Sequence, residues 1–193
     1  MPDLSIPSPA PILPDIYLMR HGETAWNVQG RLQGVLDSPL TDRGIEQARR
    51  LAELSNGIAG RRISSPQGRA VATARIAFGQ DFATDPRLSE IDVGRFTAQL
   101  LSDLQPSHPA IFTDDFGWYD RCPGGEGFAR LATRCRSLLN DLDGPALIVT
   151  HGVTLRMLRC LILGLPIDRI GQGEARQGAI HAFRQGRESL IAD

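Results

Sequence analysis

The chain has no lysine, and its charges almost cancel. All 21 basic residues are arginine, and 22 acidic residues balance them to a formal net charge of −1. A chain with so little net charge has no overall positive field for nucleic acid or an anionic membrane, so we expect neither as a partner. Any anion must be bound locally, by Arg or His. The planar guanidinium group of Arg suits a phosphate because it donates two parallel hydrogen bonds.

Cysteine and long apolar stretches are also scarce. The three cysteines, Cys122, Cys135 and Cys160, are widely spaced and form no Cys-X-X-Cys pair, so they indicate neither a disulfide framework nor a zinc site. We therefore expect a reducing, cytoplasmic environment. No apolar stretch approaches the roughly 20 residues of a membrane-spanning helix.

The start of the chain differs in composition from the rest. Residues 1–14 are rich in Pro and Ser and have neither a basic start nor a continuous apolar stretch, so they resemble neither a signal peptide nor a membrane anchor. We expect a disordered N-terminal extension over residues 1–14 and a single domain over residues 15–193. A hydrophobic content of 41% and a charged content of 22% are ordinary for one globular domain of this length.

Short apolar runs alternate with longer segments of helical periodicity. Helix-start signals are Thr41 for one helix, and Ser65 as N-cap with Pro66 as first helical residue for another. The pattern predicts strands over residues 16–19, 62–64, 146–149, 179–184 and 188–192, an extended segment over 82–88, and helices over 42–54, 65–78, 126–142 and 153–163. Such alternation implies a three-layer α/β/α sandwich with a mostly parallel sheet.

Two of the predicted strands end in a histidine. Arg20 and His21 follow the first strand, and His151 follows the run over residues 146–149. In parallel sheets the ligands gather beyond the C-terminal strand ends, so both histidines are expected at one edge. Arg69 lies one turn into a predicted helix, and His151 directly precedes another. Free N–H groups and the positive dipole at these helix starts favour a bound anion.

Six motifs follow one another along the chain. They are Arg20-His21-Gly22-Glu23-Thr24 with Asn27, Asp37-Ser38-Pro39-Leu40-Thr41 with Gly44, Ser64-Ser65-Pro66 with Arg69-Ala70 and Thr73, Leu88-Ser89-Glu90 with Gly94, Pro123-Gly124-Gly125-Glu126, and Thr150-His151-Gly152 with Arg156. In this order they resemble the histidine phosphatase superfamily, also called phosphoglycerate mutase-like, and favour its phosphatase branch. The resemblance extends from residue 16 to the end of the chain and implies the α/β fold of that family.

The resemblance implies that His21 is the nucleophile and becomes phosphohistidine. It places Arg20, Arg69 and His151 around the phosphoryl group, and makes Glu90 the acid for the leaving alkoxide and then the base for water. Phosphoryl transfer needs positioned cations more than covalent assistance, so no metal or other cofactor is implied. The residues implied to bind phosphate or substrate are Arg20, Gly22, Glu23, Thr24, Asn27, Gln33, Gly34, Arg69, His151 and Gly152.

The length of one interval separates two activities. Mutases that resemble this chain carry a long insertion between the acid and the Gly-Gly-Glu segment, and it supplies basic residues for the phosphoglycerate carboxylate. Here residues 91–124 fill that interval, with Ile91 and Val93 where mutases have Arg and Tyr. We therefore expect a metal-independent hydrolase of the histidine acid phosphatase type rather than a phosphoglycerate mutase. A non-catalytic module that docks a partner through the phosphate pocket is the alternative of another class.

The substrate is expected to be a small phosphomonoester, and the sequence does not select among sugar, nucleotide and cofactor phosphates. Five aromatic residues of the variable interval either form an apolar lid over the substrate or pack locally. They are Phe96, Phe112, Phe116, Trp118 and Tyr119. We expect a monomer or a homodimer.

Overall fold

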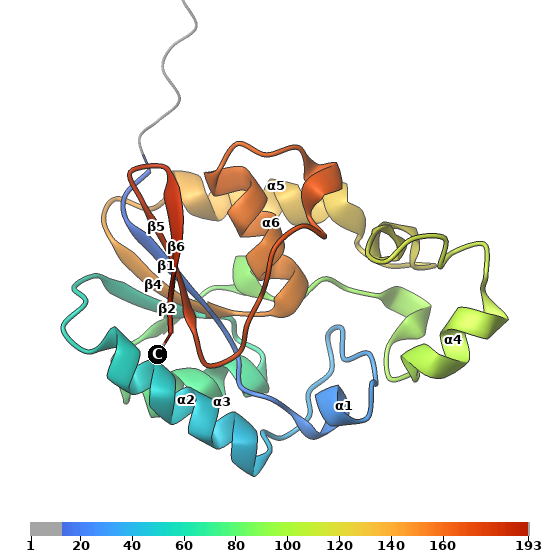
Figure 1. Cartoon of the computed structure of the whole chain (residues 1–193), viewed down its shortest axis with the longest axis horizontal. Coiled ribbons are helices and arrows are strands. Elements are labelled where there is room, and N and C mark those ends of the chain that lie inside the picture. Colours follow the sequence, from blue (N-terminus) through green and yellow to red (C-terminus); the bar gives the residue numbers. More distant parts are fainter. Residues whose placement is uncertain (1–12, 193) are drawn as a thin grey trace, which may run out of the picture.

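The computed structural model describes residues 13–192 of the chain (Figure 1). Of the extension expected over residues 1–14, residues 1–12 lie outside this range. Leu13 is half-buried and packs against the larger hydrophobic cluster of the fold. The described contacts of the fold therefore include a residue that precedes the first strand.

Strands and helices alternate through most of the described chain. The strands are β1 (Ile16–Arg20), β2 (Arg61–Ser64), β3 (Ala83–Thr84), β4 (Ala146–Thr150), β5 (Ile180–Arg184) and β6 (Arg187–Ile191). The α-helices are α1 (Ala25–Val28), α2 (Asp42–Ser55), α3 (Gly68–Phe78), α4 (Leu101–Ser107), α5 (Gly127–Asn140) and α6 (Gly152–Ile162). The short 3-10 helices are η1 (Pro86–Leu88), η2 (Gly94–Phe96), η3 (Gly117–Arg121) and η4 (Ile167–Arg169). None of the helices within residues 13–192 is long and apolar enough to cross a bilayer.

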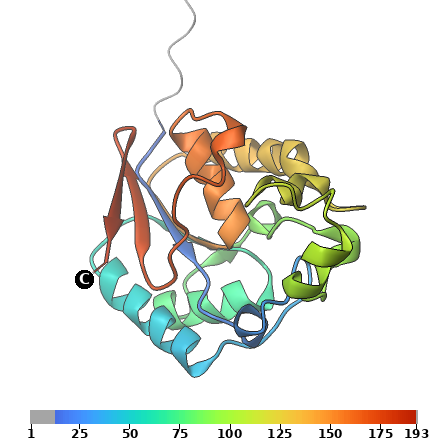
Figure 2. The same ribbon diagram turned by 45° about the vertical axis from the view of Figure 1, so that its right-hand side comes forward.

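The strands form one mixed, mostly parallel sheet in the order β3-β2-β4-β1-β5-β6. The four strands from β3 to β1 run parallel to one another, whereas β5 is antiparallel to both β1 and β6. Helices α5 and α6 cover one face of the sheet, and α2 and α3 cover the other (Figures 1 and 2). The predicted three-layer α/β fold is confirmed.

Alternate residues of the two central strands face the two helical layers. Leu18 and Ile148 belong to the hydrophobic cluster that includes α5 and α6, whereas Met19 and Val149 belong to the cluster that includes α2 and α3. All four side chains are fully buried. Strands that are buried on both faces have continuous apolar runs, which is why these two could be recognised in the sequence.

The register of these two strands brings the histidines together. Arg20 of β1 pairs with Thr150 of β4, and the N–H group of His21 donates to the Thr150 carbonyl at 2.9 Å. His21 and His151 therefore leave neighbouring parallel strands at the same edge of the sheet, as the sequence predicted.

Helix α3 begins later than predicted. Ser65 was expected as its N-cap and Pro66 as its first residue, but the helix starts at Gly68 with Gln67 at the N-cap position. The Gly68 N–H group donates to Oδ2 of Asp37, at 2.7 Å, so a carboxylate from another segment caps the helix. The Ser65 hydroxyl bonds to Nε2 of His151 at 2.7 Å. The same hydroxyl also accepts from the Gln67 N–H group at 3.3 Å, so the bond expected of a Ser65 cap is present, although the helix itself begins at Gly68.

The segment over residues 82–88 is extended over only part of its length. Ala83–Thr84 pair with β2 as the short strand β3, and Pro86–Leu88 then form the 3-10 helix η1. The side chain of Asp85 begins η1 by accepting a hydrogen bond from the Arg87 N–H group. Glu90 follows two residues after the end of η1. The remaining predicted strands and helices agree with the observed bounds to within two residues.

Gly22 allows a close contact between the end of β1 and the start of α2. A Cβ atom at Gly22 would lie 2.3 Å from the backbone oxygen of Gly44. We predict that Gly22→Ala lowers the free energy of unfolding by about 1–3 kcal/mol, because backbone has to move to relieve the overlap. Urea unfolding followed by circular dichroism measures this. The control is Gly144→Ala, where a Cβ atom meets nothing within 4 Å. Equal stability of the two variants would contradict the prediction.

Candidate active site

A pocket lies at the C-terminal edge of the parallel strands, beside His21. Its cavity volume is about 90 Å³, which is well below the roughly 300 Å³ at which pockets begin to hold drug-sized ligands. The pocket is therefore sized for a small group. Its lining residues are Arg20, His21, Asn27, Arg31, Leu32, Gln33, Gly34, Arg69, Glu90, Ile91, Val93 and Tyr119.

His21 is oriented by its own loop. Its Nδ1 atom lies 2.7 Å from the carbonyl oxygen of Gly22. A carbonyl oxygen can accept a hydrogen bond but cannot donate one. Nδ1 therefore carries the proton, and Nε2 of the neutral ring holds the free lone pair. Burial, followed by the charges of Arg69 and Arg20, lowers the pKa of His21 well below 6.5. The ring is thus neutral at neutral pH, as a nucleophile must be.

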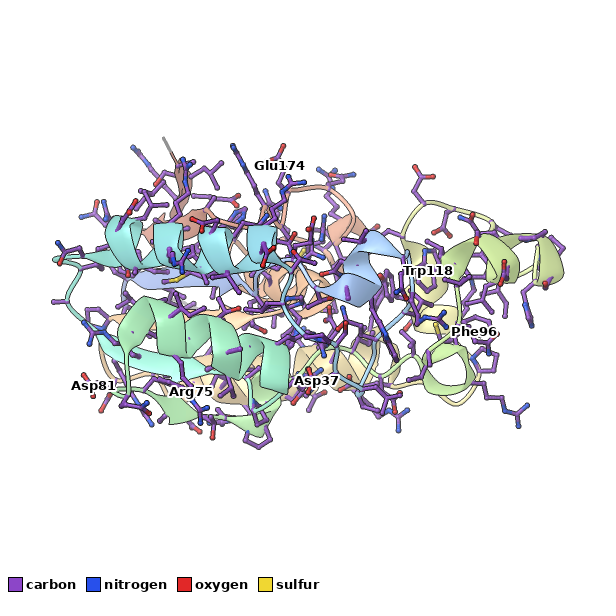
Figure 3. All side chains as sticks on the ribbon, turned by 90° about the horizontal axis from the view of Figure 1, so that it is seen from below. Asp37, Arg75, Asp81, Phe96, Trp118 and Glu174 are labelled. Atoms are coloured by element: carbon purple, nitrogen blue, oxygen red, sulfur yellow. The ribbon has the colours of Figure 1, made fainter. Side chains whose placement is uncertain are left out.

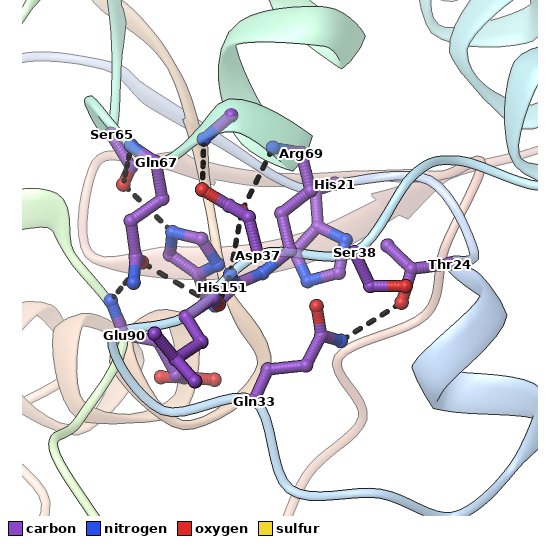
Figure 4. A network of polar contacts seen from close by, with 12 residues as sticks. His21, Thr24, Gln33, Asp37, Ser38, Ser65, Gln67, Arg69, Glu90 and His151 are labelled. Atoms are coloured by element: carbon purple, nitrogen blue, oxygen red, sulfur yellow. Dashed lines mark hydrogen bonds and ion pairs between the residues drawn. The ribbon is translucent and has the colours of Figure 1, made fainter. Parts of the chain in front are cut away.

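His151 stands next to His21, with ring centroids 5.1 Å apart (Figure 4). Burial lowers its pKa well below 6.5, and the charges of Arg69, His21, Arg20 and Arg134 lower it further. Nε2 of His151 bonds to the Ser65 hydroxyl, whereas its buried Nδ1 atom has no hydrogen-bond partner among the described residues. A negative charge beside this ring would reverse the effect of the arginines and favour the imidazolium.

Arg69 is almost fully buried and held by several acceptors. One guanidinium nitrogen, Nη1, donates to Asp37 at 2.9 Å and to the Leu36 carbonyl at 2.7 Å. The other, Nη2, donates to the Gly34 carbonyl at 3.2 Å. Figure 3 shows Asp37 beside the first turn of α3, where it anchors this arginine. The guanidinium position is therefore fixed from outside the pocket.

Several buried donors near His21 lack an acceptor. The Nε atoms of Arg20 and Arg69 are buried and make no hydrogen bond within the described part of the chain. Nη1 of Arg20 does have a partner, the Ala175 carbonyl at 3.2 Å. Buried donors without partners are rare and unfavourable, so their occurrence on two neighbouring cations beside one pocket indicates an anion site.

Glu90 lines the pocket and rests on the N-terminus of α6. Its carboxylate accepts hydrogen bonds from the N–H groups of Val153 at 3.1 Å and Thr154 at 3.0 Å, and from the Thr154 hydroxyl at 3.1 Å. It also accepts from the Ile91 N–H group at 3.0 Å. These bonds fix the carboxylate at one side of the pocket.

The two helix starts were expected to offer N–H groups to the bound anion, and several of these groups already have carboxylate acceptors. The first N–H groups of α3, at Gly68 and Arg69, donate to the Asp37 carboxylate. Those of α6 donate to Glu90. Carboxylates of the chain itself have taken these places.

The structure divides the predicted phosphate-binding residues into two groups. Asn27, Gln33 and Gly34 line the pocket together with Arg20 and Arg69. Gly22, Glu23, Thr24, His151 and Gly152 are not among the lining residues, although the His151 ring lies against that of His21. Thr24 caps α1 and accepts a hydrogen bond from the Gln33 amide at 2.9 Å, while the Glu23 carboxylate accepts one from the Thr41 hydroxyl at 2.9 Å.

Some residues that line the pocket belong to none of the sequence motifs. Arg31 and Leu32 follow α1 on an irregular loop, and Tyr119 comes from η3, far along the chain. Of the five aromatic residues considered as a lid, only Tyr119 lines the pocket. Phe96 and Trp118 are buried in the larger cluster, and Phe112 and Phe116 pack against it. Within residues 13–192 no group of three or more His, Cys, Asp or Glu side chains is arranged to hold a metal ion.

Comparison with known proteins identifies the class to which this fold and site belong. The family model "Histidine phosphatase superfamily (branch 1)" matches residues 16–190. The chain therefore belongs to the histidine phosphatase superfamily, branch 1, and is an enzyme of the phosphoglycerate mutase family.

Among curated relatives, a protein of Enterobacter sp. (strain 638) named "Probable phosphoglycerate mutase GpmB" is 39% identical over 170 residues, which cover 78% of this chain and 75% of the relative. A protein of the same name from Proteus mirabilis is 40% identical over 163 residues, with the same coverage of 78% and 75%.

The similar solved structures include named phosphatases. The α-ribazole phosphatase of Shigella flexneri has a TM-score of 0.78 at 27% identity, covering 92% of this chain and 94% of that one. A mycobacterial glucosyl-3-phosphoglycerate phosphatase has a TM-score of 0.80 at 27% identity, covering 92% and 97%. A phosphoserine phosphatase of Entamoeba histolytica has a TM-score of 0.74 at 25% identity, covering 93% and 96%.

The electrostatics of the two histidines can be tested by NMR titration. Because burial and the arginines lower the pKa of both His21 and His151, we predict that neither imidazole becomes charged as the pH falls from 7.5 to about 6. Saturating inorganic phosphate should raise the pKa of His151. Long-range ¹H–¹⁵N spectra report each protonation state, and His151→Gln assigns the signals. Midpoints near 6.5 for both rings, unchanged by phosphate, would contradict this account.

Proposed function

We propose that this chain hydrolyses a small phosphomonoester through a phosphohistidine at His21. The observation that carries the proposal is the neutral His21 ring in a pocket that Arg20 and Arg69 also line. A phosphoryl dianion bound there balances the positive charge of the two guanidinium groups.

In the first step Nε2 of His21 attacks phosphorus, and the bond from phosphorus to the ester oxygen breaks. Nδ1 keeps its proton and donates it in a hydrogen bond to the Gly22 carbonyl. This bond stabilises the positive charge that develops on the ring. Arg20, Arg69 and a protonated His151 neutralise the equatorial oxygens. Glu90, in its protonated form, gives its proton to the leaving oxygen, and an alcohol departs.

In the second step a water molecule attacks the phosphohistidine from the side that the alcohol has left. Glu90 is now a carboxylate and accepts a proton from that water, while the bond from phosphorus to Nε2 of His21 breaks. The products are inorganic phosphate and the neutral imidazole. Glu90 ends the cycle protonated, as the first step requires.

Hydrolysis is favoured over phosphoryl transfer to a second phosphoglycerate. From the interval over residues 91–124 the pocket takes Ile91, Val93 and Tyr119, and none of these described residues is a cation. Among the residues that line the pocket, Arg31 is the one arginine outside the set that binds the phosphoryl group. A carboxylate on the leaving group could therefore pair with Arg31 but with no second arginine of this lining. The names of the GpmB relatives favour a mutase as the second candidate, whereas the named structural neighbours are phosphatases.

Other parts of the assignment stay predictions from the sequence. They are the single domain over residues 15–193, the cytoplasmic location, and the state as a monomer or homodimer. The class of substrate, a small phosphorylated metabolite, rests on the modest size of the pocket.

Hydrolysis of 4-nitrophenyl phosphate by the wild type and by His21→Ala tests the proposal. We predict that the variant loses activity by roughly 10³-fold or more, because the covalent step has no nucleophile. Phosphate release from a panel of phosphometabolites, with 3-phosphoglycerate included, then separates the hydrolase from the mutase. Equal activity of the two proteins would overturn the proposal, and formation of 2-phosphoglycerate without phosphate release would favour the mutase.

The role of Glu90 is tested by the leaving group. We predict that Glu90→Gln lowers kcat/KM for alkyl phosphates by about 10²-fold or more, and much less for 4-nitrophenyl phosphate, whose leaving oxygen needs little protonation. The measurement is kcat/KM across esters of increasing leaving-group pKa. A uniform decrease across the series would show that Glu90 is not the acid.

A further inference from the structure

Gln67 joins three walls of the pocket through one side-chain amide (Figure 4). Its oxygen accepts hydrogen bonds from the Glu90 N–H group at 2.8 Å and from Nη2 of Arg69 at 3.4 Å. Its NH₂ group donates to the Gly34 carbonyl at 2.9 Å. The residue is 9% exposed, so these bonds are made largely out of water.

The segments that Gln67 connects are far apart in the sequence. Gly34 lies on the loop after α1, Arg69 in the first turn of α3, and Glu90 in the loop that follows η1. Arg69 has independent anchors in Asp37 and the Leu36 carbonyl. The Glu90 carboxylate is anchored on α6. The Gln67 amide oxygen therefore links Glu90, the proposed acid, to Arg69, the proposed phosphoryl-binding cation, through hydrogen bonds.

The chemistry of the three contacts requires an amide at this position. The Glu90 N–H group needs an acceptor, and the Gly34 carbonyl needs a donor. A glutamate supplies the acceptor but no donor, and a methionine of the same length supplies neither. Only a primary amide of this reach satisfies both with a single side chain.

Resting on the proposed function, we infer that Gln67 is a positioning residue that sets Glu90 against the leaving oxygen. It touches neither phosphorus nor the leaving group in the proposed mechanism. Its effect is exerted through the Glu90 backbone, whose displacement by a fraction of an ångström weakens proton transfer because general acids act within hydrogen-bond reach. Phosphoryl binding depends less on Gln67, because Asp37 holds Arg69 independently.

The test compares Gln67→Met with Glu90→Gln and with the double variant. We expect Gln67→Met to lower kcat/KM for alkyl phosphates by about 10-fold to 10²-fold and for 4-nitrophenyl phosphate by less than about threefold. In the double variant the loss should be no larger than in Glu90→Gln alone, because both changes remove the same proton transfer. Inhibition by inorganic phosphate should stay within about threefold of the wild type.

Gln47→Met is the matched control, since the Gln47 amide oxygen also accepts from a glutamate N–H group, that of Glu23, at 2.7 Å. It should leave the dependence on the leaving group unchanged. Gln67→Glu keeps the acceptor for Glu90 and should also keep the wild-type dependence, although phosphate should bind more weakly beside the added charge. If Gln67→Met does not fold, Gln67→Ala repeats the test, because it removes the same hydrogen bonds without adding bulk, and the same selective loss for alkyl phosphates is expected.

The outcomes separate the inference from the function on which it rests. Losses that are equal for all esters, or that add to those of Glu90→Gln, would assign Gln67 a general structural role and overturn the inference. Unchanged kinetics would overturn it as well. Absence of phosphatase activity in the wild type would instead remove the proposed function itself.

Discussion

The constraint on which the rest of the structure depends is the placement of two guanidinium groups, on half-buried Arg20 and buried Arg69, beside two buried imidazoles. Like charges and donors without acceptors are unfavourable in a buried place, and here the imidazoles respond by staying neutral. The Asp37 carboxylate stabilises Arg69 from behind, and the sheet register fixes His21 and His151 side by side. The site is therefore organised before an anion arrives, which is what electrostatic stabilisation of a phosphoryl transition state requires.

The same constraint explains how the helix ends are used. A helix N-terminus attracts anions, and both helices that begin at the pocket bind a carboxylate of the chain itself, Asp37 on α3 and Glu90 on α6. In each case the bound carboxylate is then held where a second group needs it. Asp37 orients the Arg69 guanidinium, and Glu90 lies in the pocket lining. The N-termini of α3 and α6 thus orient these two carboxylates.

The sequence predicts features that depend on residues near one another in the chain. It carries no signal for positions that depend on contacts between distant segments. Apolar runs that end in His21 and His151 predict both the central strands and their shared edge, because parallel strands place their ends together. The start of α3 was predicted too early, because the helix is capped by Asp37, which comes from another segment of the chain. Tyr119 and Gln67 had no signal of their own, because their position depends on segments brought together only by folding.

The most direct test of the account is a crystal structure of the protein with vanadate, which adopts the five-coordinate geometry of phosphoryl transfer. The account predicts vanadium bonded to Nε2 of His21, with equatorial oxygens in contact with the guanidinium groups of Arg20 and Arg69 and an apical oxygen next to Glu90. Vanadate bonded through Nδ1, or bound away from the two histidines, would contradict it.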